Sequence, residues 1–147
     1  MDSIYYDLKK LQRLVSDLTD TGSWFPSVRV RAFAQVVDFR AGTDGSFSQI
    51  CLNTLPDFGQ GCTLILDVSE PVFENRFGSA EDNAVRLFDP VDVRASIWCK
   101  KDVDESMICT LEVLDICSIS TQEIDTFKQF LHSTEGGEFM SLSQMNK

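Results

Sequence analysis

Few residues of this chain are of the types that carry catalysis or hold metal ions. There is one histidine, His132, and the five cysteines form no Cys-x-x-Cys pair, so a zinc site would need an unusual set of distant ligands. The acidic group Asp102, Asp104 and Glu105 lacks the spacing of a calcium-binding loop. The sequence therefore predicts no metal site and no cofactor.

Sequence motifs of enzymes are also missing. The chain has no glycine-rich phosphate loop, no His-Glu-x-x-His motif and no Gly-x-Ser-x-Gly nucleophile elbow. A Ser-His or Cys-His pair would have to place its nucleophile beside His132. We assign no catalytic residue and expect a protein that is not an enzyme. The cysteines lie in apolar segments that we interpret as strands, which predicts buried free thiols at Cys51, Cys62, Cys99, Cys109 and Cys117.

Three arginines are the candidates for contacting nucleic acid. Arg29 and Arg31 share one face of a predicted strand, and Arg94 projects from a later strand. The whole chain carries 23 acidic and 13 basic residues, a net charge of -10. Phosphate contacts need clustered lysine and arginine, so we expect this chain alone to bind nucleic acid weakly. The alternative is that the arginines only balance an acidic surface.

A second candidate surface lies near the C-terminus. The capping box Ser120–Glu123 predicts the start of a helix over residues 120–133. Its apolar side chains cover more than one narrow stripe, whereas a helix packed on a barrel needs only one apolar face. We therefore predict a partner contact by four residues: Ile124, Phe127, Phe130 and Leu131. The alternative is that all four pack inward.

The remaining pattern predicts the elements that carry these residues. Ile4, Leu8 and Leu11 begin a helical stripe within an N-terminal helix over 1–22. Period-two alternation begins at Val28, and the second face of that strand changes from basic to apolar, so the strand must bend and serve two sheets.

Four further strands are predicted after this first one. They cover residues 47–53, 62–68, 91–100 and 107–116. Residues 70–77 lie between the strands predicted at 62–68 and 91–100, and they either extend the first of these strands or form a helical turn. Ser79 resembles the start of a short helix.

This order predicts a mainly β protein with flanking helices, namely a five-stranded OB-fold barrel with an N-terminal and a C-terminal helix. We expect one domain over 1–135, with its barrel over 28–117, and a flexible tail over 136–147. No apolar stretch is long enough to span a membrane, and the N-terminus does not resemble a signal peptide, so no membrane partner is expected.

Two segments resemble a known family. They are Asp7–Val15 (Asp-Leu-Lys-Lys-Leu-Gln-Arg-Leu-Val) and Phe47–Asp57 (Phe-Ser-Gln-Ile-Cys-Leu-Asn-Thr-Leu-Pro-Asp). With the barrel order and the length, they resemble the smallest subunit of the CST telomere-capping complex of budding yeasts. The resemblance implies a heterodimer with the middle OB-fold subunit of that complex and, through it, contact with the large subunit.

The resemblance also implies a function and a location. The expected role is to support binding of telomeric single-stranded DNA, mainly through the complex, in telomere capping and length regulation, within the nucleus at chromosome ends. The same architecture is similar to the smallest subunit of replication protein A, so a scaffold subunit of a general single-stranded DNA-binding complex is an alternative. An OB-like protein-interaction adaptor with no nucleic-acid role is another.

Overall fold

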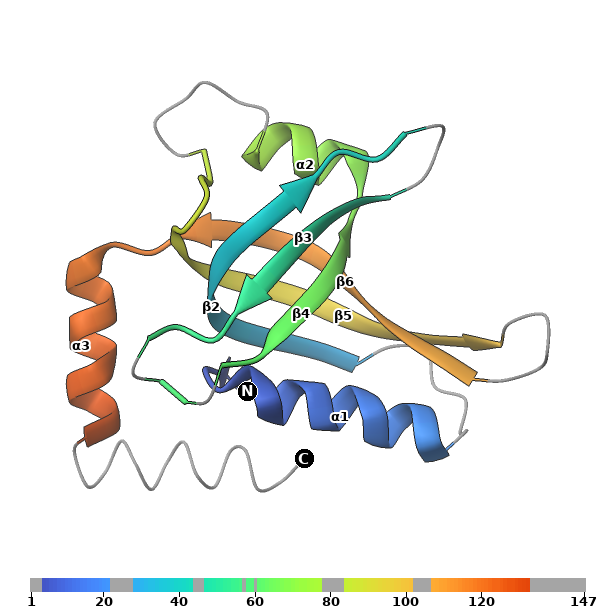
Figure 1. Cartoon of the computed structure of the whole chain (residues 1–147), viewed down its shortest axis with the longest axis horizontal. Helices are drawn as coiled ribbons and strands as arrows, with labels where there is room; N and C mark the ends of the chain where they lie inside the picture. Colours follow the sequence, from blue (N-terminus) through green and yellow to red (C-terminus); the bar gives the residue numbers. More distant parts are fainter. Residues whose placement is uncertain are drawn as a thin grey trace.

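The computed structural model describes residues 4–21, 28–43, 47–56, 58–59, 61–77, 84–101 and 107–132. The predicted tail over 136–147 lies outside them. The elements along the chain are β1 (Ile4–Tyr5), α1 (Leu8–Thr21), β2 (Val28–Arg40), β3 (Ser48–Asn53), β4 (Thr63–Val68), α2 (Glu70–Arg76), β5 (Pro90–Lys101), β6 (Met107–Ser118) and α3 (Thr121–His132). Figure 1 shows the strands wrapped into a barrel, with α1 along one end and α3 standing beside it.

Five strands close on one another. β2 pairs antiparallel with β3, β3 with β4, and β5 with both β6 and β2, while a short parallel pairing joins β4 to β6. The two-residue strand β1 adds a parallel partner to β2. This closed five-stranded barrel with an N-terminal and a C-terminal helix has the OB-fold arrangement, and the predicted fold class is confirmed.

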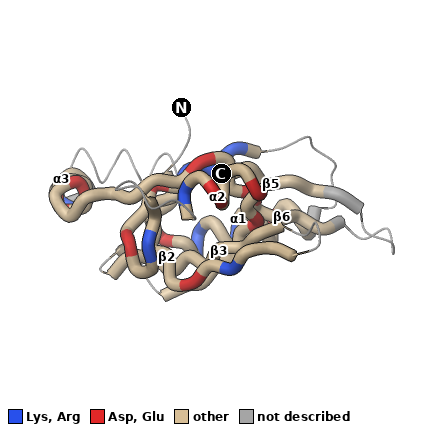
Figure 2. Tube along the Cα trace, turned by 90° about the horizontal axis from the view of Figure 1, so that it is seen from above, with Lys and Arg blue, Asp and Glu red and all other residues tan. Residues whose placement is uncertain are grey.

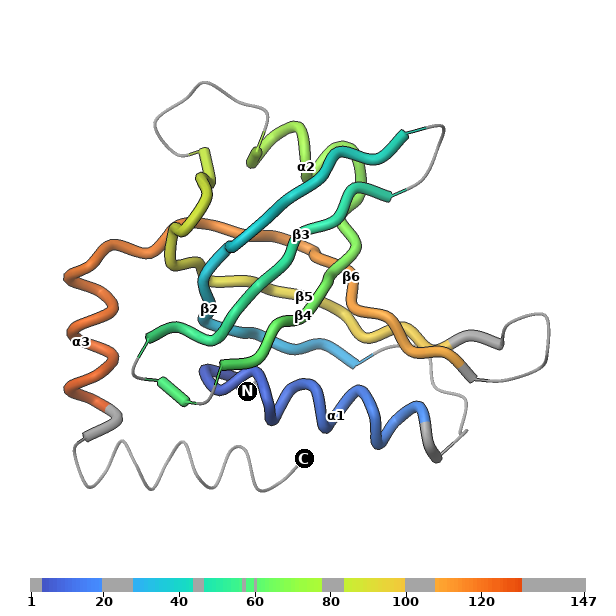
Figure 3. The backbone as a smooth tube through the Cα atoms, viewed as in Figure 1, coloured from blue at the N-terminus to red at the C-terminus, as the bar shows by residue number. Residues whose placement is uncertain are grey.

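The bend of β2 closes the barrel. Its residues Val28–Gln35 pair with β5 and its residues Gln35–Arg40 pair with β3, with a bulge between Val36 and Asp38. A bulge adds one residue to a strand, which bends it and increases its twist. Figure 3 shows β2 curving between the two groups of strands, as the change of its buried face predicted.

Alternate residues of the strands fill the barrel interior. Each fully buried valine, leucine or isoleucine side chain of this kind stabilises the folded state by about 1.5–3 kcal/mol. The inward set includes Val30, Ala32, Ala34, Val36, Ile50, Leu52, Leu64, Leu66, Val68, Val91, Val93, Ala95, Ile97, Leu111, Val113 and Ile116. The period-two pattern of the sequence therefore identified the core face of the strands that begin near Val28 and Val91.

The N-terminal helix begins at Leu8 and not in the first residues. Asp7 caps it, since its Oδ1 accepts a hydrogen bond from the Lys9 amide at 3.1 Å. The Leu8 amide donates to Thr54 Oγ1 at 3.3 Å, which fastens the helix start to the chain after β3. Before this cap Tyr5 is buried in the core as part of β1, so the predicted helical stripe starts one turn too early.

A helix does form between β4 and β5, at Glu70–Arg76. Pro71 in its first turn favours this start because its missing amide proton would be unpaired there in any case. Of the two readings for residues 70–77, the helical turn is the one observed. The helix start predicted at Ser79 lies outside the described residues.

The prediction of buried free thiols is confirmed for Cys62 and is wrong for the other four cysteines. Cys99 and Cys109 are direct partners in the β5–β6 register and form a disulfide with a Cα–Cα distance of 4.2 Å. Cys62 is buried, Cys51 is half-buried and Cys117 is exposed. Pairing of this kind follows from the register of a hairpin, which cysteine spacing alone does not determine.

Two further findings concern the described part of the chain. None of its helices is long and apolar enough to cross a membrane. Within the same residues, no three acidic, histidine or cysteine side chains gather closely enough to hold a metal ion.

Candidate functional site

Helix α3 starts where β6 leaves the barrel, and its capping box is formed as predicted. The Ser120 amide donates to Glu123 Oε2 at 2.9 Å, and the Glu123 amide donates to Ser120 Oγ at 3.1 Å. This reciprocal pair satisfies two backbone donors that a helix start leaves without partners. The cap therefore defines the first turn of α3.

Phe127 attaches the helix to the barrel. Its ring lies edge-on to Phe33 of β2 at 4.7 Å between centroids and edge-on to Tyr6 at 6.0 Å. It also stacks on Phe58 at 5.8 Å, and Lys128 Nζ lies 5.6 Å from the Phe58 ring centre. Aromatic pairs of this geometry stabilise by about 0.5–1.5 kcal/mol each beyond their buried area.

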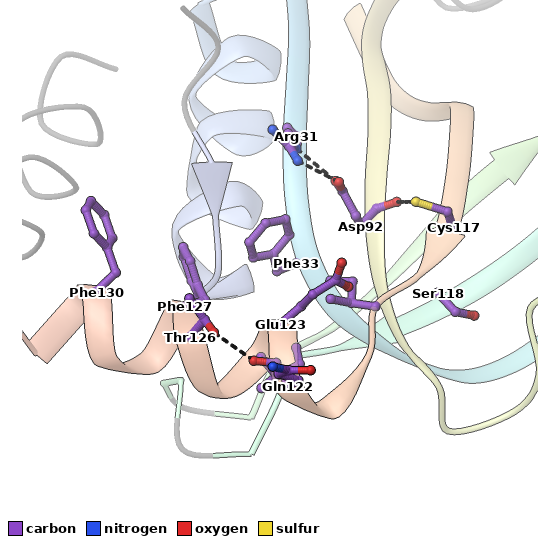
Figure 4. Close-up of a pocket in the computed structure, with 12 residues that line it drawn as sticks. Arg31, Phe33, Asp92, Cys117, Ser118, Gln122, Glu123, Thr126, Phe127 and Phe130 are labelled. Carbon is purple, nitrogen blue, oxygen red and sulfur yellow. Dashed lines mark hydrogen bonds and ion pairs between the residues drawn. The ribbon is translucent and has the colours of Figure 1, made fainter.

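The other predicted partner residues differ in their exposure to solvent. Ile124 is half-buried, and Phe130 keeps 44% of its surface exposed. Leu131 belongs to α3, but its side chain lies outside the description. Figure 4 shows Phe127 turned toward Phe33, with Phe130 standing away from both. The four residues therefore do not all pack inward.

A groove of about 680 Å³ separates α3 from the barrel. Both of its walls mix apolar and polar side chains. The lining residues include Phe33, Asp92, Cys117, Ile124, Phe127 and Phe130. A cleft beside a helix that presents Ile124, Phe127 and Phe130 suits an extended or helical segment of another protein.

Arg31 belongs to the floor of this groove. Its guanidinium donates two hydrogen bonds to the Asp92 carboxylate, from Nε at 2.9 Å and from Nη2 at 2.6 Å, and lies 5.4 Å from the Phe33 ring centre. A bidentate pair holds both charges in one geometry. Partial desolvation of the otherwise exposed Cys117, with added repulsion from Asp92 and Asp115, raises the pKa of its thiol.

The three predicted arginines lie on one outward face of the β2–β5 sheet. Arg31 is directly opposite Arg94, and Arg29 is opposite Ser96. Arg29 and Arg94 are exposed, whereas Arg31 is held by Asp92. Trp98 shares this face with 43% of its surface exposed, and sequence reasoning did not select it as a site residue. The alternation Asp92, Arg94, Ser96, Trp98 was the signal that could have identified it.

The outward face of β3 and β4 is different in character. OB folds commonly use these strands and the adjoining loops to hold oligonucleotides. Here the face carries Ile65, and Gln49 donates to Asp67 at 3.3 Å. A hollow of about 360 Å³ beside it is lined by Arg40 and the exposed Phe47. Figure 2 shows the acidic and basic positions of the described residues scattered along the tube.

Comparison with known proteins gives a fold likeness. No protein-family model matches the chain, and no curated protein sequence matches it. Among solved structures, the N-terminal domain of PriB from Thermoanaerobacter tencongensis is 15% identical with a TM-score of 0.41, covering 65% of this chain and 97% of that one. The mitochondrial single-stranded DNA-binding protein Rim1 of S. cerevisiae is 19% identical with a TM-score of 0.41, covering 65% and 98%. A likeness at this level assigns no function to this chain.

Proposed function

We propose that this protein is a non-enzymatic OB-fold subunit that pairs with a second protein through α3 and the groove beside it. One observation carries the proposal: α3 is held to the barrel by Phe127, while Phe130 stays exposed beside an open groove. An exposed phenylalanine on a capped, ordered helix loses little conformational freedom on binding. Aromatic anchors of this kind dominate the buried centres of many interfaces.

The partner we propose is the middle OB-fold subunit of a CST-type complex, through which the chain would also meet the large subunit. Support comes from the resemblance of Asp7–Val15 and Phe47–Asp57 to the smallest CST subunit and from the OB barrel with a C-terminal helix. The proposed location is the nucleus, at chromosome ends, with roles in telomere capping and length regulation.

Binding of telomeric single-stranded DNA is proposed to be mainly a property of the assembled complex. A net charge of -10 disfavours close approach of phosphates to this chain by itself. The chain would then act as a scaffold that stabilises its partner and adds a few contacts to the nucleic acid.

Co-purification of this chain with the middle CST subunit of the same species tests the proposal. Phe130→Ala should weaken pairing by about thirtyfold or more, because a truncated anchor leaves its pocket on the partner unfilled. Phe47→Ala is the matched control, since Phe47 is an exposed phenylalanine (53% against 44%) on the β2–β3 connection. Both variants should fold normally.

The outcome also separates the alternatives. Pairing with the middle subunit of replication protein A instead would place the chain in a general single-stranded DNA-binding complex. Pairing through α3 in a complex that has no affinity for DNA would indicate a protein-interaction adaptor. Normal pairing of Phe130→Ala in every case would contradict the role of α3.

A further inference from the structure

A second surface, separate from the α3 groove, combines an exposed indole with two cations. On the outward face of the β2–β5 sheet, Trp98 is 43% exposed and both Arg29 and Arg94 are exposed. Between them lies Ser96, which is only 3% exposed. Trp98, Arg29 and Arg94 are therefore the exposed side chains that a ligand could meet here.

The strand register places these residues within reach of one short ligand. Arg29 is directly opposite Ser96, so it is the diagonal neighbour of both Arg94 and Trp98 at about 7–8 Å. Arg94 and Trp98 lie four residues apart on β5, about 14 Å at the usual rise of a strand. Long arginine side chains can close much of either separation.

The charge state of this face favours an anion. Within the described residues no carboxylate pairs with Arg29 or Arg94, whereas Arg31 is bound to Asp92. Asp115, opposite Arg94 on β6, is instead bound to Arg76 of α2. Glu112, opposite Ser96, is the acidic group that remains on the face and opposes the two cations. Its presence is consistent with weak binding.

We propose that Trp98, Arg29 and Arg94 form a contact for one or two nucleotides of single-stranded DNA, with a base stacked on Trp98 and the arginines on flanking phosphates. Stacking on an aromatic ring is tolerant of sequence, and arginine suits phosphate. The competing hollow beside β3 and β4 offers one arginine, Arg40, and a carboxylate, Asp67, in its lining. This inference rests on the proposed single-stranded DNA role.

The first experiment measures binding of a labelled single-stranded DNA oligonucleotide of mixed sequence to the full chain at low ionic strength. Trp98→Ala should weaken binding by about fivefold to a hundredfold. Arg29→Ala and Arg94→Ala should each lower the slope of log affinity against log salt by about 0.7. Phe47→Ala and Arg40→Ala, the matched aromatic and cation of the other hollow, should leave affinity unchanged.

The second experiment reads the stacking directly. In a Trp24→Phe background, Trp98 is the single tryptophan, because the chain has two. Adding the oligonucleotide should quench its fluorescence, whereas inorganic polyphosphate of equal charge should not. Quenching by both would show that Trp98 responds to charge alone and would overturn the stacking role.

Other outcomes would also overturn the inference. One is no measurable DNA binding at low ionic strength. A second is that affinity for DNA falls only in Phe47→Ala and Arg40→Ala. A third is that Trp98→Ala loses protein pairing but keeps its DNA binding. The last outcome would mean that Trp98 contacts a protein partner instead of DNA. Such a contact is the competing explanation, because Ile108 on β6 is a partly exposed apolar residue diagonal to Trp98. The α3 proposal fails separately, because it is measured by pairing of Phe130→Ala and not by oligonucleotide affinity.

Discussion

Helices α1 and α3 are both amphipathic and lie at opposite ends of the chain, yet they have different parts in the fold. In α1, Leu8 and Leu11 are almost fully buried, and the helix packs across β6 with further contacts to β1, β4 and β5. In α3, Phe127 makes the ring contacts to the barrel and Phe130 remains exposed. Apolar periodicity thus predicts that a helix has something to cover, but not whether the covered surface belongs to the same chain.

The physical difference lies in the surface that each helix covers. Without α1, the end of the barrel beside Leu66 and Leu111 would lose apolar cover, since α1 residues belong to the same buried cluster. Helix α3 instead stands beside a sheet face whose outward residues already pair with one another, as Arg31 does with Asp92. Four predictions test this contrast, beginning with the largest expected effect.

Leu11→Ala should destabilise the whole protein. Leu11 is 2% exposed, and truncating a buried leucine costs about 2–5 kcal/mol through lost burial and the cavity that remains. Thermal or denaturant unfolding of the isolated chain measures the change. A loss below about 1 kcal/mol would mean that α1 is as separable from the barrel as α3, and the contrast would not hold.

The buried Tyr5, just before α1, should make the folded protein less stable at alkaline pH. Burial raises its pKa to about 12, and among the described residues its hydroxyl has no hydrogen-bond partner. An unfolded tyrosine loses its proton near pH 10, so above that pH the folded state binds the extra proton. The stabilisation is complete below about pH 10 and decreases as pH rises toward 12, by at most about 1.4 kcal/mol per pH unit.

Tyr5→Phe is the control for this pH dependence. It should unfold with a shallower alkaline slope and should keep its stability at neutral pH, because the hydroxyl that it removes has no hydrogen-bond partner in the described part of the chain. Equal alkaline slopes in the two proteins would contradict burial of Tyr5 against the barrel.

Phe127→Ala should have an intermediate effect of about 1–3 kcal/mol, since the half-buried ring has three aromatic partners but does not belong to the central core. The loss should appear as detachment of α3, seen as faster hydrogen exchange in that helix, with little change in barrel unfolding. Pairing with the partner should weaken as well. A loss of about 3–5 kcal/mol in barrel unfolding would instead place Phe127 in the central core.

Much of the barrel could be predicted from the sequence because the alternation of apolar and polar residues along a strand is a local pattern. The alternation from Val28 and again from Val91 identified the buried faces, and the change of face along β2 predicted its bend. The disulfide, the strand at Tyr5 and the ring contacts of Phe127 depend on registers between distant segments, which no local pattern encodes. For the same reason Trp98 was visible as an outward residue but not as the neighbour of Arg29 on another strand.

The smallest effect is expected at the cap of α3. Ser120→Ala removes the oxygen that accepts from the Glu123 amide, and losing an N-cap costs about 1 kcal/mol. Because α3 is attached mainly by Phe127, this cost should be confined to the helix: hydrogen exchange in α3 should speed up several-fold while the melting temperature of the barrel stays the same. Ser120→Asp should restore slow exchange, because a carboxylate at this position accepts the same bond and suits the positive end of the helix. A fall in the barrel melting temperature with Ser120→Ala would instead show that α3 unfolds together with the barrel. In that case the exposed Phe130 would lie on a helix that the fold itself requires. Helices α1 and α3 would then not differ in their contribution to the stability of the barrel.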